Sequence, residues 1–108
     1  MKSDRQVNIA NIADAQDSFA VLETSDVCQT AVMTLTPGQA SGEKGNEHPQ
    51  SEQVLLVLEG EVVAEVGDTR SVLGRGDVVI VPRHVAHRFT NETQSQAITF
   101  NVYSPPAY

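Results

Sequence analysis

The side chains in this sequence that are best suited to binding a divalent metal are those of its three histidines. His48 ends a polar loop, His84 follows a proline in a turn, and His87 begins an alternating segment. Taken singly, each is most simply interpreted as a hydrogen-bonded residue of a core or rim. The lone Cys28 is interpreted as a small core residue, because nothing around it in the sequence would activate a thiol.

Short β-strands are the elements that must position these histidines. Apolar and β-branched residues gather in eight segments, and Gly, Pro or Asp punctuates the sequence about every ten residues. The predicted strands cover residues 19–22, 28–36, 54–58, 62–66, 70–73, 78–81, 87–90 and 97–103. This spacing predicts an all-β sandwich or barrel, with the longest loop over residues 39–53.

One stretch resembles the second sequence motif of the cupin superfamily. Gly76, Pro82, His87 and Asn91 all occur at the offsets of that motif. The departure is His84, which stands where the family usually has Gly. Because four positions match at fixed offsets on a predicted strand–turn–strand, the resemblance is specific.

An earlier stretch is similar to the first cupin motif, but it keeps fewer of the motif residues. His48 and Gly60 match, whereas Asn46 and Gln53 occupy positions that are His and Glu in the family. Ala40 stands at the position of the leading Gly. The first motif is therefore degenerate.

The resemblance spans residues 30–103 and implies one cupin domain, an all-β, jelly-roll-like double-stranded β-helix barrel. We expect a single domain over residues 1–108, with a lead-in over 1–18, the barrel over 19–103 and a tail over 104–108. Cupins commonly hold Fe, Mn, Ni, Cu or Zn in the barrel mouth. They include dioxygenases, isomerases, decarboxylases, sugar-binding regulators and storage proteins, so the family alone names no reaction.

The resemblance places the metal ligands at Asn46, His48, Gln53 and His87. Imidazole suits divalent first-row metals, but two neutral amides replace a His and a Glu, so we expect weak affinity. Glu52 is a further candidate for the missing carboxylate. On a regular strand, however, it points to the face opposite Gln53.

The leading hypothesis is a small cytoplasmic cupin whose degenerate divalent-metal site binds or transforms a small polar molecule. An enzyme would use the metal as a Lewis acid or to activate dioxygen. The missing Glu counts against the cupin dioxygenases and decarboxylases that rely on it. The alternative is a non-catalytic, metal-free barrel that binds a small ligand, and the sequence leaves open whether the protein is an enzyme.

Apolar residues of the strands are expected to fill the barrel and to form the wall of a ligand pocket. The simpler interpretation of Tyr103 is a rim residue packed against Pro105 and Pro106, and the alternative is that its hydroxyl binds a ligand. The residues predicted to fill the barrel are Met33, Leu35, Leu55, Val57, Phe89, Phe100 and Val102.

Charge and composition exclude some partners. The formal net charge of −7 argues against binding to nucleic acid or to an anionic membrane surface. A single cysteine forms no intrachain disulfide, which favours a reducing cytoplasm, and we expect neither a secretory signal nor a membrane span. The family resemblance, rather than the residues, leads us to expect a homodimer.

Overall fold

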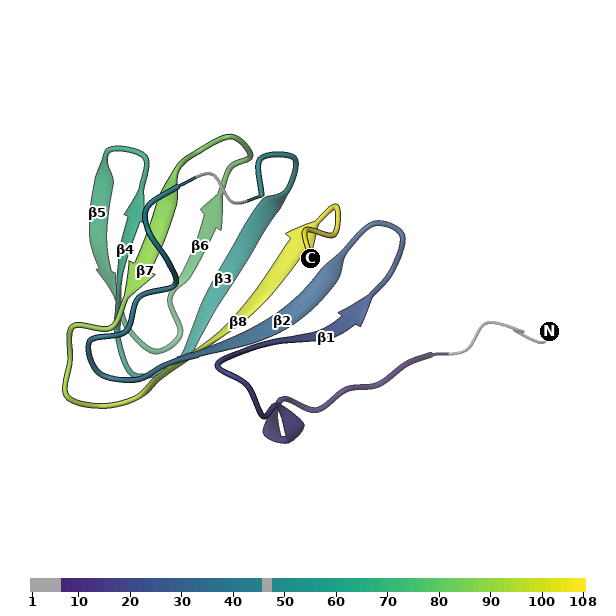
Figure 1. The fold of residues 1–108 in the computed structure, drawn as a ribbon, viewed down its shortest axis with the longest axis horizontal. Helices are drawn as coiled ribbons and strands as arrows, with labels where there is room; N and C mark the ends of the chain where they lie inside the picture. Colours follow the sequence, from purple (N-terminus) through teal and green to yellow (C-terminus); the bar gives the residue numbers. More distant parts are fainter. Residues whose placement is uncertain (1–6, 46–47) are drawn as a thin grey trace.

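All the predicted strands form, and they pair into two antiparallel sheets (Figure 1). The computed structural model describes residues 7–45 and 48–108. Within that part, a 3-10 helix η1, Ile12–Asp14, precedes the strands, and no helix is long and apolar enough to cross a membrane. The strands are β1 Phe19–Thr24, β2 Gln29–Leu35, β3 Glu52–Glu59, β4 Val62–Val66, β5 Thr69–Leu73, β6 Val78–Val81, β7 His87–Thr90 and β8 Ala97–Ser104.

The last strand lies at the centre of the larger sheet. The strand order there is β1-β2-β8-β3-β6, and the smaller sheet has the order β5-β4-β7. Tyr103 on β8 is therefore in register with Gln29 on one side and Gln53 on the other. The topology thus brings together residues that are far apart in the sequence, and it confirms the all-β prediction.

The core lies between the inward faces of the two sheets, because successive strand residues point to opposite faces. Met33, Leu35, Leu55, Val57 and Phe89 are buried in it, as predicted from the sequence. The remaining members of this cluster are Val62, Ala64, Val81 and Ala97.

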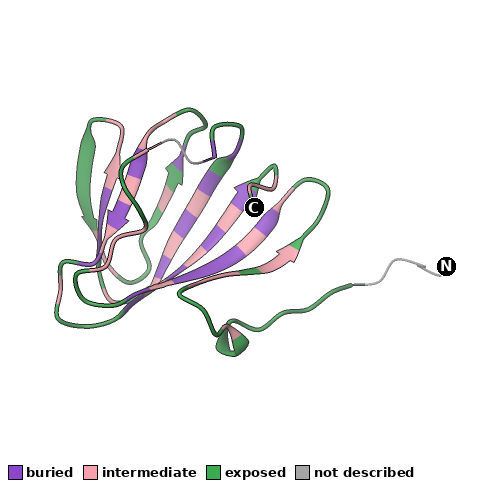
Figure 2. Cartoon of the chain, viewed as in Figure 1, coloured by how far each residue is buried: buried purple, intermediate pink, exposed green. Residues whose placement is uncertain are grey.

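Phe100 and Val102 do not fill the barrel, so that part of the prediction is wrong. They are only partly buried, and they are in register with Leu56 and Val54 on the outward face of β3. The inward positions of β8 are instead Ala97, Thr99, Asn101 and Tyr103, all of which are buried. Figure 2 shows the resulting alternation of buried and intermediate residues along β8 and β3.

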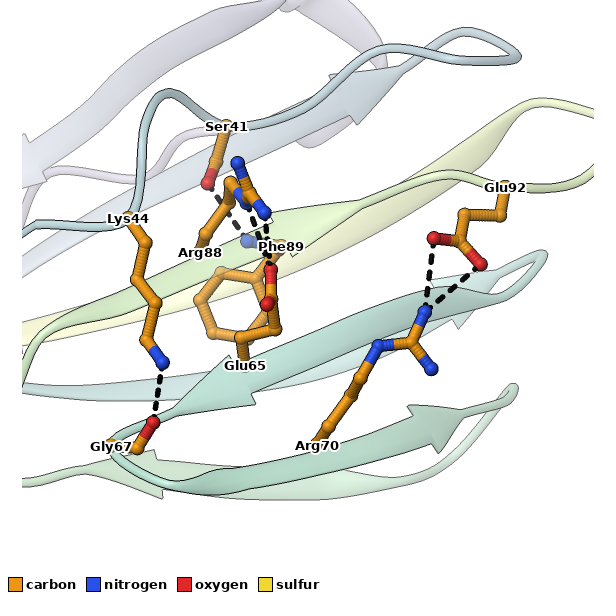
Figure 3. A network of polar contacts seen from close by, with 8 residues as sticks. All are labelled: Ser41, Lys44, Glu65, Gly67, Arg70, Arg88, Phe89 and Glu92. Carbon is orange, nitrogen blue, oxygen red and sulfur yellow. Dashed lines mark hydrogen bonds and ion pairs between the residues drawn. The ribbon is translucent and has the colours of Figure 1, made fainter.

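The smaller sheet presents a charged outer face. Arg88 on β7 pairs with Glu65 on β4 at 2.8 Å, and Arg70 on β5 pairs with Glu92 at 3.1 Å (Figure 3). The Arg70–Glu92 pair is exposed and the Arg88–Glu65 pair is partly exposed, and pairs open to solvent add little to stability. They do show that this face is suited to exposure to solvent.

Candidate ligand pocket in the barrel mouth

A cavity of about 240 Å³ is lined by residues from both sheets, from the loop after β2, and from the segments that precede β1 and follow β8. None of its described lining residues is Asp, Glu, Lys or Arg. The lining residues are Ser18, Phe19, Met33, Thr34, Leu35, Gln39, Ala40, Ser41, Gln53, His87, Phe89, Tyr103 and Tyr108.

A buried chain of polar side chains runs from His48 into the barrel. Nε2 of His48 donates to Oε1 of Gln53 at 2.9 Å, since an amide oxygen only accepts. Nε2 of Gln53 then donates to Oδ1 of Asn101 at 2.8 Å. Nδ2 of Asn101 donates to Oγ1 of Thr99 at 3.0 Å. Such a satisfied network fixes the orientation of the Gln53 amide at the cavity wall.

A tight turn places His48 at the entry to β3. Its carbonyl accepts from the Ser51 amide at 3.0 Å, and Pro49 supplies the fixed φ that suits the second position of such a turn. The ring is buried, with an exposed fraction of 5%, and its Nδ1 faces the Ser51 carbonyl oxygen at 3.3 Å. The turn therefore points the imidazole inward.

His87 is held from two sides at the start of β7. Its backbone exchanges hydrogen bonds with Gly45, so the long polar loop runs beside β7 as an additional short pairing. Its Nδ1 donates to the Val85 carbonyl at 2.9 Å, because that oxygen only accepts. The ring centroids of His48 and His87 lie 4.5 Å apart.

Aromatic rings form a wall along the cavity. The Tyr103 ring lies 5.2 Å from His48 and 5.1 Å from Tyr108, and Tyr108 in turn lies 4.9 Å from Phe19. At the other end, the rings of His87 and Phe89 are 6.1 Å apart. A flat or partly apolar ligand face can stack on such a wall.

The tail is held against the barrel mouth rather than left loose. Oε1 of Gln29 accepts from the backbone amides of Ala107 and Tyr108, at 3.1 and 2.9 Å. Nε2 of Gln29 donates back to the Tyr108 carbonyl at 2.7 Å. The Ser51 hydroxyl donates to the Pro105 carbonyl at 2.6 Å. These bonds hold Tyr108 as one wall of the cavity.

Three of the four predicted ligand positions come together. Gln53 and His87 line the cavity, and His48 lies behind them, bonded to Gln53 and with its ring beside that of His87. Asn46 is outside the described residues. Glu52 is exposed and follows the outward alternation of β3, so it does not join them.

Two other motif residues have structural roles. His84 is exposed and adopts φ 66, a left-handed conformation that explains why the family usually has Gly at this position. Asn91 is fully buried, and its side chain donates to the carbonyls of Leu35 and Ser95 and accepts from Thr93.

The described residues fit a divalent metal poorly. In residues 7–45 and 48–108, no three His, Cys, Asp or Glu side chains are grouped so that they could hold a metal ion. The predicted ligands that are described are two imidazoles and one neutral amide, and Nε2 of His48 already donates to that amide. A metal would have to break this bond without gaining a carboxylate to balance its charge.

Sequence reasoning missed Asn101, Thr99, Phe19 and Tyr108. A signal for the first two was present: on β8 the polar residues Thr99 and Asn101 alternate with apolar residues that face outward. No comparable signal marked Phe19 or Tyr108, because only the folded tail brings these rings together.

The comparisons with known proteins agree with the geometry. The profile of the cupin domain family matches residues 31–103. The uncharacterized protein YdbB of Bacillus subtilis (strain 168) is 32% identical over 98 residues, which cover 87% of this chain and 77% of that protein. The uncharacterized protein L612 of Acanthamoeba polyphaga mimivirus is 28% identical over 89 residues. That match covers 79% of this chain but only 54% of the viral protein.

Solved structures show the same fold. TT1209 from Thermus thermophilus superposes with a TM-score of 0.80 and 28% identity, covering 92% of this chain and 98% of that one. A cupin family protein from Methanocaldococcus jannaschii with a double-stranded β-helix fold gives a TM-score of 0.77 at 21% identity. The superposition covers 96% of this chain and 94% of the Methanocaldococcus jannaschii chain. The predicted fold class is confirmed.

Proposed function

Because the chain belongs to the cupin domain family, we propose that its barrel mouth binds a small uncharged molecule that carries hydroxyl, carbonyl or amide groups. The observation that carries the proposal is the composition of the cavity wall. It consists of the Gln53 amide, which is held by its hydrogen bond to Asn101, the His87 imidazole and a row of aromatic rings. The proposal includes a cytoplasmic location, which the single cysteine favours.

The charge of the lining supports an uncharged ligand. A buried carboxylate or phosphate needs a cationic partner, and none of the described lining residues is Lys or Arg. The volume of 240 Å³ corresponds to about eight water molecules, which suits a small metabolite. The lining supplies hydrogen-bonding groups and stacking surfaces, so we propose binding as its function.

Thermal unfolding with a ligand panel tests this proposal. Small sugars, polyols and amides are compared with carboxylates and phosphates of similar size. We expect a neutral compound to stabilise the protein by about 2.7 kcal/mol when its concentration is about a hundred times its Kd. For a domain of this size that raises Tm by about 10 °C or more.

Variants connect the stabilisation to this pocket. Gln53→Met removes the amide, and Tyr108→Leu removes one aromatic wall without touching the polar chain. Both should reduce the ligand-induced rise in Tm, whereas Gln94→Met, an exposed glutamine in the loop before β8, should leave it unchanged. If charged compounds alone stabilise the protein, or if both pocket variants respond like wild type, the proposal is wrong.

A divalent metal held by His48 and His87 is a second candidate, which the 4.5 Å separation of their rings favours. Elemental analysis of protein purified without chelators should then find about one metal per chain, absent from a His48→Ala, His87→Ala double variant. Gln53→Glu should tighten zinc or nickel binding, since it adds a charge-balancing carboxylate. If neither the wild type nor Gln53→Glu retains metal after loading, the metal candidate is wrong. The ligand proposal is unaffected by that result.

A further inference from the structure

A buried glutamine holds the strap, which we define as residues 105–108, the segment that follows β8. Gln29 is 2% exposed, and its side-chain amide has two N–H groups and an oxygen with two lone pairs. The oxygen accepts from the backbone amides of Ala107 and Tyr108, and one N–H donates to the Tyr108 carbonyl. The other N–H donates to Oγ1 of Thr24 at 2.9 Å. Three of these four hydrogen bonds therefore go to the strap.

The strap is attached by side chains rather than by a sheet. Figure 1 shows it in yellow, turning back beside the end of β8. Residues 105–108 belong to no strand, and Pro105 and Pro106 have no N–H group to donate to a neighbouring strand. A terminal segment outside the sheets opens at a lower free energy than the core strands do. Water can then replace the strap as the partner of the Gln29 amide, so that opening leaves no buried polar group unpaired.

Tyr108 is the strap residue that faces the pocket. Its ring centroid lies 4.9 Å from that of Phe19, at the start of β1, and 5.1 Å from that of Tyr103, near the end of β8. All three residues line the cavity. Tyr108 is 54% exposed, whereas Tyr103 is only 3% exposed. Tyr108 therefore stands between the solvent and the inner wall of the pocket.

We infer that Tyr108 is a gate to the pocket and that Gln29 is the positioning residue that keeps this gate closed. The inference rests on the proposed binding function and concerns how a ligand enters. An open strap lets a ligand pass between Phe19 and Tyr103, and a closed strap lays the Tyr108 ring against it as a stacking surface. Because only the open state admits a ligand, the fraction of open molecules scales the rate of association.

Gln29 can be changed without altering the pocket itself. It is not among the described residues that line the cavity. Gln29→Met keeps the length of the side chain but removes the amide. The variant should therefore release the strap and leave the lining residues in place.

Tyrosine fluorescence of the full chain tests the gate. The sequence contains two tyrosines and no tryptophan, so the emission comes from Tyr103 and Tyr108 alone. Tyr108→Phe keeps a ring in the gate and leaves Tyr103 as the only emitter. The quencher is acrylamide, a small uncharged amide of the class proposed to enter the pocket. Adding Gln29→Met to Tyr108→Phe should increase the quenching of Tyr103 by about threefold or more, and Tyr108→Ala, which removes the ring, should do the same.

Hydrogen exchange followed by NMR tests the latch directly. The amides of Ala107 and Tyr108 donate to Gln29, so their exchange should accelerate by about 10-fold or more in Gln29→Met. Amides of β8 should keep their exchange rates, which separates local opening of the strap from unfolding of the barrel.

The matched control is Thr24→Val, which removes the one hydrogen bond of Gln29 that does not go to the strap. It should change quenching and exchange by less than about twofold. Circular dichroism verifies that each variant is folded. Ser51→Ala removes the hydroxyl that donates to the Pro105 carbonyl, and it provides a second way to loosen the strap if Gln29→Met does not fold.

Three results would overturn the inference. Equal quenching of Tyr103 in Tyr108→Phe and Tyr108→Ala would mean that residue 108 is no barrier. Unchanged exchange of the two strap amides in Gln29→Met would mean that Gln29 is not the latch. An equal effect of Thr24→Val would place the change at the start of β2 rather than in the strap.

The gate and the binding function can fail separately. Strap variants that open the gate as expected, in a protein whose Tm no neutral compound raises, would support the gate and reject the binding function. A ligand-induced rise in Tm, in a protein whose strap variants change neither quenching nor exchange, would support binding and reject the gate.

Discussion

At the scale of single residues, Gly60 shows why a motif glycine is needed where the backbone is crowded. It adopts φ 76, and a Cβ there would meet the Gln96 carbonyl oxygen and lie 2.9 Å from the Ala97 Cα. Gly60→Ala should therefore lower the free energy of unfolding by about 3 kcal/mol, adding an overpacking cost to the cost of a left-handed alanine. Denaturant unfolding measures this loss.

Gly76 is the control for the crowding. It has φ 90, but a Cβ at this position would have no atom within 4 Å, so Gly76→Ala should cost only the conformational part, about 1–2 kcal/mol. Equal losses in the two variants would mean that the contact with residues 96 and 97 relaxes. Gly60 would then be required for its conformation alone.

At the scale of elements, β8 explains both the success and the failure of sequence reasoning. Alternation and turn residues predicted where each strand lies, and the motif offsets predicted that His48, Gln53 and His87 meet. Alternation alone does not say which face is inward. Phe100 and Val102 were therefore placed in the barrel, although Thr99 and Asn101 occupy it.

The inverted pattern of β8 has a physical interpretation. Polar side chains inside a barrel are stable only when they are hydrogen-bonded, and Asn101 and Thr99 complete the chain that fixes Gln53. Apolar side chains outside favour burial against another surface. One strand thus supplies both the polar residues behind the proposed ligand pocket and apolar residues on the outer face of the larger sheet. The tail that places Tyr108 at the pocket follows no sequence period, so only the folded structure reveals it.

At the scale of the whole molecule, net charge governs which polyanions the protein can approach. The chain carries a formal net charge of −7 at neutral pH. The basic side chains described on the smaller sheet, Arg88 and Arg70, are already paired with carboxylates. Binding to DNA or to an anionic membrane would have to overcome long-range repulsion.

We therefore predict no binding to duplex DNA or to anionic lipid vesicles, even at about 0.05 M salt, where electrostatic attraction is strongest. Electrophoretic mobility shift and vesicle co-sedimentation measure this, with a basic protein of similar size as the positive control. Binding that weakens steeply as salt increases would contradict the prediction. It would indicate a local basic surface whose attraction outweighs the repulsion from the net charge. The protein would then bind a polyanion as well as the proposed small molecule.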